Sequence, residues 1–167
     1  RRSVPQGTGS NAKDIMKTTT ALGYASLLSE RSIMRHFRNA TNIRPVLIRN
    51  HARCFNSYGT LSVKRGLAVP GSPYLSHASA ILRPGSDLLA LAFDLNDDDY
   101  RAYQRHEFRY SLKPVPVTPQ HGGETFEAIL CFENVDHEID ASLVGKTSLF
   151  DLYDDYGVSS FWHTDHL

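Results

Sequence analysis

Apolar runs alternate with polar segments along the first third of the chain. Residues 20–24 form an apolar run that predicts a short buried strand. Ser29 then provides a good N-cap for a helix over about 30–38. A β-rich run follows at 45–56. Together these signals predict a strand, a loop, a helix and a second strand, in that order.

The second half of the chain continues this alternation. Strands are expected at 80–82 and 88–94, on either side of a turn at 84–87. Asn96 is expected to cap a helix that runs to about Glu107, with aspartates in its first turn, where the helix dipole favours negative charge. The remaining expected elements are a strand pair at 115–118 and 125–133 and a helix near 149–156. The pattern therefore predicts a mixed α/β (α+β) domain.

Three segments fall outside this pattern of strands and helices. Residues 1–19 are polar, and we expect them to form an extended tail because they have too little apolar surface to fold alone. Residues 57–78 hold several glycines and prolines, which predicts a long irregular loop facing a ligand or a partner. We place the folded domain at 20–156 and expect a C-terminal extension at 157–167, which breaks off in mid-pattern, so that the natural protein continues.

Composition sets bounds on the class of protein. With 167 residues, 41% of them hydrophobic, the chain can bury a single core without disulfides or metal. The 18 Lys and Arg balance the 18 Asp and Glu and are scattered, which argues against a nucleic-acid partner. No run approaches the roughly 18 apolar residues of a transmembrane helix, so none is expected.

The cysteines and the N-terminal composition bear on the compartment. Cys54 and Cys131 each lie in an apolar run and are too few for the disulfide framework of a small secreted protein, which favours a reducing compartment. The first 20 residues are rich in Arg, Ser and Thr and contain one acid, as organellar transit peptides do. The cytoplasm and an organelle such as the plastid stroma both remain open.

Several short motifs occur in a fixed order between residues 20 and 133. Gly23-Tyr24-Ala25-Ser26-Leu27 follows the first expected strand, and Arg53-Cys54-Phe55-Asn56 ends the second. In this order they resemble motifs of the γ-glutamylcyclotransferase family, whose members carry Tyr-Gly-Ser-Leu or Tyr-Gly-Ser-Asn in the first loop and Arg-x-Phe-Asn after it. Each motif is weak alone, and their order carries the resemblance. The later matches are Pro84-Gly85, Phe93-Asp94, Asp97–Asp99, Glu107, Tyr110 and Val115–Val117.

The resemblance implies a fold, a reaction and a site. The fold would be a small curled, barrel-like mixed sheet with flanking helices. The reaction would cyclise a γ-glutamyl group to 5-oxoproline and release an amine, with no metal or cofactor. Glu107 would be the catalytic acid and base. The residues that would bind the substrate, a γ-glutamyl small molecule, are Tyr24, Ala25, Ser26, Leu27 and Tyr110.

Helical spacing supports an inward orientation for Glu107. Tyr103 and Tyr100 lie four and seven residues before it, so the three side chains share one helix face. Burial on that face and the negative end of the helix dipole would both raise the pKa of its carboxyl group. Backbone N–H groups between Ala25 and the following helix N-terminus could hold the substrate carboxylate. The competing interpretations are a solvated glutamate, core tyrosines and a turn serine at Ser26.

Two residues depart from the family pattern and keep a second hypothesis open. Ala25 stands where the family has Gly, and its β-carbon could block a backbone conformation that only Gly permits. Gln104 stands where many members have Asp. The second hypothesis is a noncatalytic accessory or scaffold subunit of a large organellar assembly, for example a plastid thylakoid photosystem complex. Its other protein subunits would bind residues 1–20 and 57–78.

Overall fold

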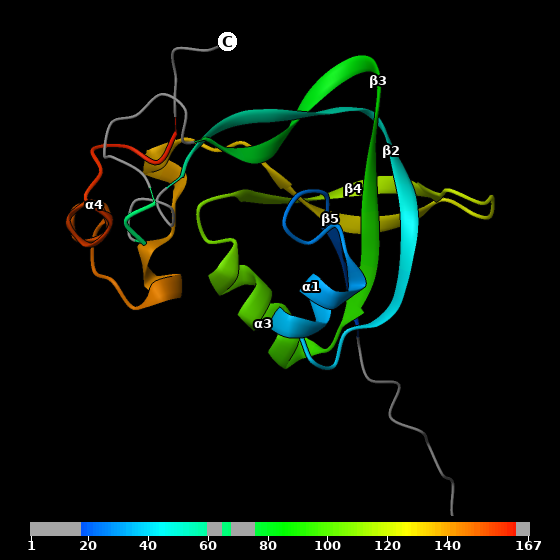
Figure 1. Cartoon of the computed structure of the whole chain (residues 1–167), viewed down its shortest axis with the longest axis horizontal. Helices are drawn as coiled ribbons and strands as arrows, with labels where there is room; N and C mark the ends of the chain where they lie inside the picture. The colour runs from blue at the N-terminus through cyan, green and yellow to red at the C-terminus, as the bar shows by residue number, and fades with distance from the viewer. Residues whose placement is uncertain (1–17, 60–64, 68–75, 163–167) are drawn as a thin grey trace, which may run out of the picture.

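The strands of the protein close into a barrel, as a computed structural model shows for residues 18–59, 65–67 and 76–162 (Figure 1). Five strands, three α-helices and two 3-10 helices make up this part of the chain. The prediction of a barrel-like mixed sheet with flanking helices is confirmed. In chain order the elements are β1 (Thr19–Gly23), α1 (Glu30–His36), β2 (Thr41–Tyr58), β3 (Ser76–Leu95), α3 (Asp97–His106), β4 (Ser111–Pro119), β5 (Phe126–Phe132), η1 (Asp136–Glu138), η2 (Ala141–Val144) and α4 (Leu149–Tyr156).

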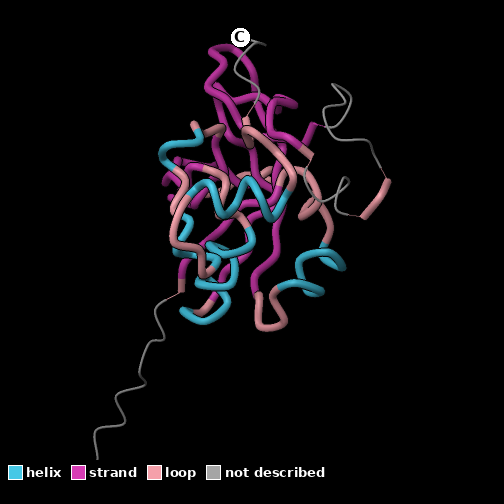
Figure 2. Tube along the Cα trace, turned by 90° about the vertical axis from the view of Figure 1, so that its left-hand side faces the viewer, coloured by secondary structure: helices cyan, strands magenta, loops and turns pink. Residues whose placement is uncertain are grey.

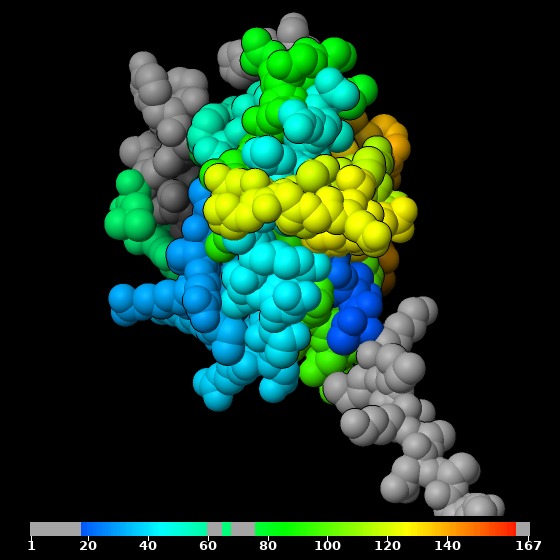
Figure 3. Space-filling model, turned by 90° about the vertical axis from the view of Figure 1, so that its right-hand side faces the viewer, coloured from blue at the N-terminus to red at the C-terminus, as the bar shows by residue number. Residues whose placement is uncertain are grey.

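Both parallel and antiparallel contacts close the barrel, whose strand order is β1-β3-β2-β4-β5. Neighbours in this order from β1 to β5 pair antiparallel, and Figure 3 shows the β4–β5 hairpin lying across β2. The circle closes where β1 runs parallel to β5, with Ala21 opposite Ile129. A second parallel contact joins β3 to β5, with Ala80 opposite Phe132. The C-terminal end of β1 therefore lies next to β5.

β2 and β3 pair as two long strands, and the turn predicted at 84–87 is wrong. The register passes from Arg49↔Asp87 to His51↔Leu82, so four residues of β3 lie opposite Asn50 alone. Gly85, with φ of 80°, donates its N–H to Asn50 Oδ1 at 3.0 Å. The Pro-Gly pair therefore forms a bulge that bends the ladder without ending it.

The helices lie on the outside of the strands (Figure 2). Two of them begin at the caps that the sequence predicts: Ser29 Oγ accepts the N–H of Ser32 at 3.2 Å, and Asn96 Oδ1 accepts that of Asp99 at 2.8 Å. α1 and α3 lie side by side, where the rings of Phe37 and Tyr103 are 5.7 Å apart. This packing completes the main core, which also includes Ile33, Phe93, Leu95 and Leu130.

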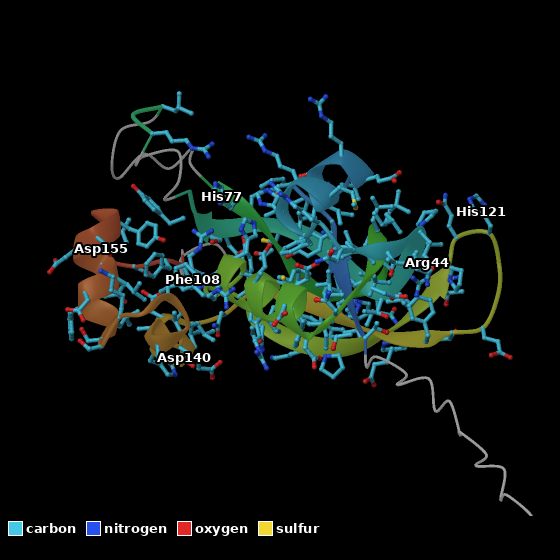
Figure 4. The ribbon with its side chains drawn as sticks, turned by 90° about the horizontal axis from the view of Figure 1, so that it is seen from below. Arg44, His77, Phe108, His121, Asp140 and Asp155 are labelled. Carbon is cyan, nitrogen blue, oxygen red and sulfur yellow. The ribbon has the colours of Figure 1, made fainter. Side chains whose placement is uncertain are left out.

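A second apolar cluster forms after β5. Phe161 and Trp162 are buried there with Phe108, and the N–H of Tyr58 donates to the carbonyl of Phe161 at 2.8 Å. The folded unit thus continues past the end of α4, where we expected the C-terminal extension to begin, to at least Trp162. Figure 4 shows Phe108 between the barrel and the α4 region. The other buried members are Ile139, Ala141 and Leu152.

Several expectations fall on residues that the structure does not describe. The 57–78 loop is shorter than expected, because Ser57 and Tyr58 belong to β2 and Ser76–Ala78 to β3. Residues 1–17, 60–64, 68–75 and 163–167 lie outside the described ranges. They include most of the two segments assigned to protein partners. No helix in the described part of the chain has the length and apolar character of a membrane span.

The loop after β1 folds back tightly enough to require glycine at position 23. A β-carbon built on Gly23 would lie 2.5 Å from Leu27 Cβ and closer still to the Leu27 carbonyl oxygen. We expect Gly23→Ala to displace this loop and to lower the free energy of unfolding by about 2 kcal/mol or more, because the clash involves backbone. Urea unfolding measures the change.

Ala25→Gly in the same loop is the control. It adds no atoms, so it should lower the free energy of unfolding by at most about 1 kcal/mol, through backbone entropy alone. Equal stability of Gly23→Ala and the parent protein would contradict the close approach of Gly23 and Leu27.

Candidate active site

A small cavity, open to solvent, lies where the end of β1 meets the end of α3. It gathers all six residues to which the sequence assigned catalysis or substrate binding, with strands β3 and β5 as its other walls. Residues 24–27 and 107–110 are far apart in the sequence, so only the closed barrel brings them together. The lining residues are Leu22, Gly23, Tyr24, Ala25, Ser26, Leu27, Ala78, Glu107, Tyr110 and Cys131.

The loop at the mouth of the cavity accepts alanine at position 25. Among the described residues, the non-glycine residues with positive φ are Asn42 and Asn50, so the backbone at Ala25 does not adopt the left-handed conformation that favours Gly. The glycine that this loop requires is Gly23, two positions earlier. The first departure from the family pattern is therefore compatible with the loop.

The same loop offers unused hydrogen-bond donors. The N–H of Leu28 donates to the carbonyl of Ala25 at 3.0 Å, whereas those of Ser26 and Leu27 have no partner within the described ranges. The Arg53 guanidinium donates to the carbonyl of Tyr24 and holds the start of the loop. The sequence did not assign Arg53 to the site, although its Arg-x-Phe-Asn motif was a signal.

Glu107 is the buried carboxyl group of the cavity. It is the C-cap of α3, where its N–H donates to the carbonyl of Tyr103 at 2.9 Å, and its side chain is only 13% exposed. Burial raises the pKa of Glu107 to about 7, and the positive charge of Arg109 partly opposes this shift. The carboxyl group is therefore poised between its two protonation states near neutral pH.

The histidine next to Glu107 does not neutralise it. His106 Nε2 lies 3.8 Å from Glu107 Oε1. Burial is the main cause that lowers the pKa of His106, and the positive charge of Arg109 lowers it further. The ring is therefore uncharged at neutral pH. The contact is accordingly not a strong ion pair. Glu107 can change its protonation state without breaking one.

Tyrosine hydroxyls fix the walls of the cavity. Tyr24 Oη donates to the carbonyl of Cys131 at 2.6 Å, and Tyr110 Oη donates to the carbonyl of Ala78 at 2.9 Å. Burial raises the pKa of Tyr110 to about 12 and raises the pKa of Tyr24 well above its ordinary value, so both stay protonated. Each hydroxyl has used its single proton, which leaves its oxygen as an acceptor. These residues serve the packing and retain acceptors toward the cavity.

Two further buried residues, Tyr103 and Cys131, lie near Glu107. Tyr103 is fully buried, and its Oη donates to the carbonyl of Leu22 at 3.2 Å and lies 3.0 Å from Cys131 Sγ. Burial and the nearby Glu107 raise the pKa of the Cys131 thiol, which makes it a packing residue and not a nucleophile. The sequence did not indicate Cys131 as a site residue, since an apolar strand pattern carries no signal for one.

Gln104, the second departure from the family pattern, lies beside the cavity and not in it. It lines a larger neighbouring cavity that shares Glu107 and Tyr110 with the first. No cluster of three or more His, Cys, Asp or Glu side chains in the described ranges is arranged to hold a metal ion.

Comparison with known proteins identifies the fold. No protein-family model and no curated protein matches the sequence. A γ-glutamyl cyclotransferase structure matches with a TM-score of 0.54 and 14% identity, over 70% of this chain and 68% of that one. An uncharacterized protein from Homo sapiens matches with a TM-score of 0.56 and 13% identity, over 70% and 67%.

A solution structure from Arabidopsis thaliana covers more of the chain. It matches with a TM-score of 0.55 and 10% identity, over 87% of each chain. At such identities the likeness concerns the backbone. The barrel with its flanking helices accordingly has the γ-glutamylcyclotransferase-like fold.

Proposed function

We propose that the protein is a γ-glutamyl cyclotransferase, which cyclises the γ-glutamyl group of an amide to 5-oxoproline and releases an amine. One observation carries the proposal: a buried carboxyl group with a pKa of about 7 shares a small cavity with a loop that has free N–H groups. This reaction needs a group that carries protons, placed beside backbone N–H groups that bind the substrate carboxylate. It needs no other catalytic group. The neighbour named γ-glutamyl cyclotransferase has the same fold.

The two ends of a glutamyl group match the two sides of the cavity. Its α-carboxylate would accept hydrogen bonds from the N–H groups of Ser26 and Leu27. Its α-ammonium would then lie toward Glu107 and the hydroxyl oxygens of Tyr24 and Tyr110, all of which accept hydrogen bonds. This orientation places the nucleophilic nitrogen next to the proton acceptor.

Glu107 would move two protons in turn. Its carboxylate takes one proton from the α-ammonium, and the freed nitrogen attacks the γ-carbonyl carbon to form the ring bond. The bond from that carbon to the leaving nitrogen then breaks as Glu107 returns the proton to the leaving nitrogen. The ring nitrogen still carries one proton more than the product lactam. Glu107 takes this proton as well and passes it to the released amine, which becomes an ammonium ion. Glu107 ends ionised. A pKa near 7 suits both directions of transfer.

The accessory-subunit hypothesis has no comparable support. It depends on residues 1–20 and 57–78, most of which lie outside the described ranges. The departure at Ala25, which had favoured it, is compatible with the loop backbone. No observation on the described residues points to a plastid or photosystem complex.

Replacing the proton carrier should abolish turnover. We expect Glu107→Gln to lower kcat for 5-oxoproline release by about 10²- to 10⁴-fold, because the amide keeps the shape of the side chain but cannot carry a proton. The control is Glu127→Gln, at an exposed position on β5 outside the cavity, which should leave kcat unchanged. Activity of Glu107→Gln equal to that of the control would overturn the proposed mechanism.

The pH profile should report the same group. Glu107 must be ionised to accept the first proton, so kcat/KM should rise with pH and level off through an apparent pKa of about 7. Initial rates between about pH 4 and about pH 9, in buffers of constant ionic strength, measure this limb. A limb centred near the ordinary glutamate value of 4.5 would show that a different group carries the proton.

Stability should respond to pH independently of any substrate. The folded-state pKa of Glu107, about 7, lies above its ordinary value of 4.5, so the folded protein binds the extra proton and loses stability as pH rises from 4.5 to 7. Glu107→Gln lacks this loss. Urea unfolding should show the variant gaining about 3 kcal/mol relative to the parent between pH 4.5 and pH 8. A difference that stays constant with pH would mean that Glu107 is solvated.

A further inference from the structure

We infer that the second cavity receives the leaving amine and selects amines that carry a second positive charge, such as a terminal diamine. This inference rests on the proposed function and names its substrate class. The cavity is larger than the first and opens to solvent on the C-terminal side of α3. Its polar lining residues are Gln104, Glu107, Tyr110, Ser111, Asn134, Glu138 and Asp140.

Glu107 stands between the two cavities. It lines both, together with Tyr110, whereas the loop of residues 24–27 lines only the first. If the loop holds the glutamyl end of a substrate, the leaving nitrogen must lie within hydrogen-bond reach of Glu107 to receive its proton. The rest of the leaving group then continues away from the loop, and the second cavity is the space on that side.

The charge of the second cavity is negative. Glu138 and Asp140 are exposed carboxylates, neither forms an ion pair with another described residue, and no Lys, Arg or His lines the cavity. Asp140 Oδ1 accepts the N–H and the hydroxyl of Ser142 at 3.0 and 2.6 Å, which fixes the side chain. Figure 4 shows Asp140 at the same end of the molecule as Phe108, which also lines the cavity. A cationic leaving group would compensate these charges.

Two amide side chains belong to the polar lining of the second cavity. Asn134 Nδ2 donates to the carbonyl of Arg109 at 3.2 Å, while its Oδ1 is buried with no hydrogen-bond partner in the described protein. Because this oxygen has no accessible surface, it lies behind the cavity wall, and Asn134 contributes to the cavity as a polar lining residue. Gln104 supplies a neutral amide to the same cavity, where an aspartate would have added a fourth carboxyl group. Neutral and anionic acceptors together suit an ammonium group.

The test compares two substrates that differ by one charge. The full chain is assayed with the γ-glutamyl conjugates of 1,4-diaminobutane and of butylamine, which has the same carbon chain without the second ammonium. We expect kcat/KM to favour the diamine conjugate by about tenfold at low ionic strength. The preference should shrink as salt is added, because the two carboxylates are exposed.

A double variant attributes the preference to the cavity. In Glu138→Gln with Asp140→Asn, the asparagine keeps an oxygen for the N–H of Ser142 and the shape of both side chains is retained. The ratio of the two kcat/KM values should fall toward one, because the diamine conjugate loses the carboxylates that its second ammonium group would contact. The control is Glu124→Gln with Glu127→Gln, which removes the same charge from exposed positions outside the cavity and should keep the ratio.

The outcomes separate the two proposals. Equal turnover of both conjugates by the parent protein, or a preference that survives the double variant, overturns the inference and leaves the cyclotransferase function standing. Turnover of neither conjugate counts against the function itself. Binding of free 1,4-diaminobutane then tests the cavity separately and is followed through the side-chain amide resonances of Asn134. A shift of these resonances that the double variant abolishes supports amine binding in the second cavity. The absence of a shift overturns the inference.

Discussion

The parallel contact between β1 and β5 is the constraint on which the site depends. It closes the barrel at Ala21 and Ile129 and directs the chain that leaves β1 across the end of α3. The hydrogen bond from Tyr24 Oη to the carbonyl of Cys131, at 2.6 Å, fixes the loop to the same strand. Without that closure the loop and Glu107 would have no common cavity. The requirement for glycine at position 23 follows from the same tight path.

Burial of Glu107 illustrates a conflict between stability and the proposed chemistry. The carboxyl group lies at the end of a helix, against tyrosines, with an uncharged histidine 3.8 Å away and Arg109 as the charge that opposes the rise in its pKa. Such surroundings favour the neutral form and destabilise the ionised one. A site selected only for stability would replace Glu107 with an apolar residue or pair it with a cation. A proton carrier, in contrast, needs an ionisable group in surroundings that shift its pKa toward neutral pH.

The two departures from the family pattern have different structural meanings. Ala25 sits on backbone that accepts a β-carbon, so it leaves the loop intact. Gln104 lines the second cavity and removes a negative charge from the neighbourhood of Glu107. The first is neutral for the proposed reaction. The second bears on the environment of the leaving group, where Glu138 and Asp140 already supply negative charge.

The sequence by itself determined the local elements, because caps and periodicity are encoded in neighbouring residues. Ser29 and Asn96 begin their helices as expected, the expected helix at 149–156 is present as α4, and the motif order identified the fold. It misjudged Pro84-Gly85, since a Pro-Gly pair reads as a turn, and only the pairing of β3 with β2 shows that it forms a bulge.

Only the tertiary structure decided what surrounds Glu107. Helical spacing indicated an inward side chain, but the cavity wall also includes Cys131 and Ala78, which arrive from distant strands and have no local signal. The packing of Phe161 and Trp162 on Phe108 also has no local signal, and neither has the second cavity. These contacts depend on barrel closure, in which residues about a hundred positions apart become neighbours, and no short sequence pattern encodes such pairing.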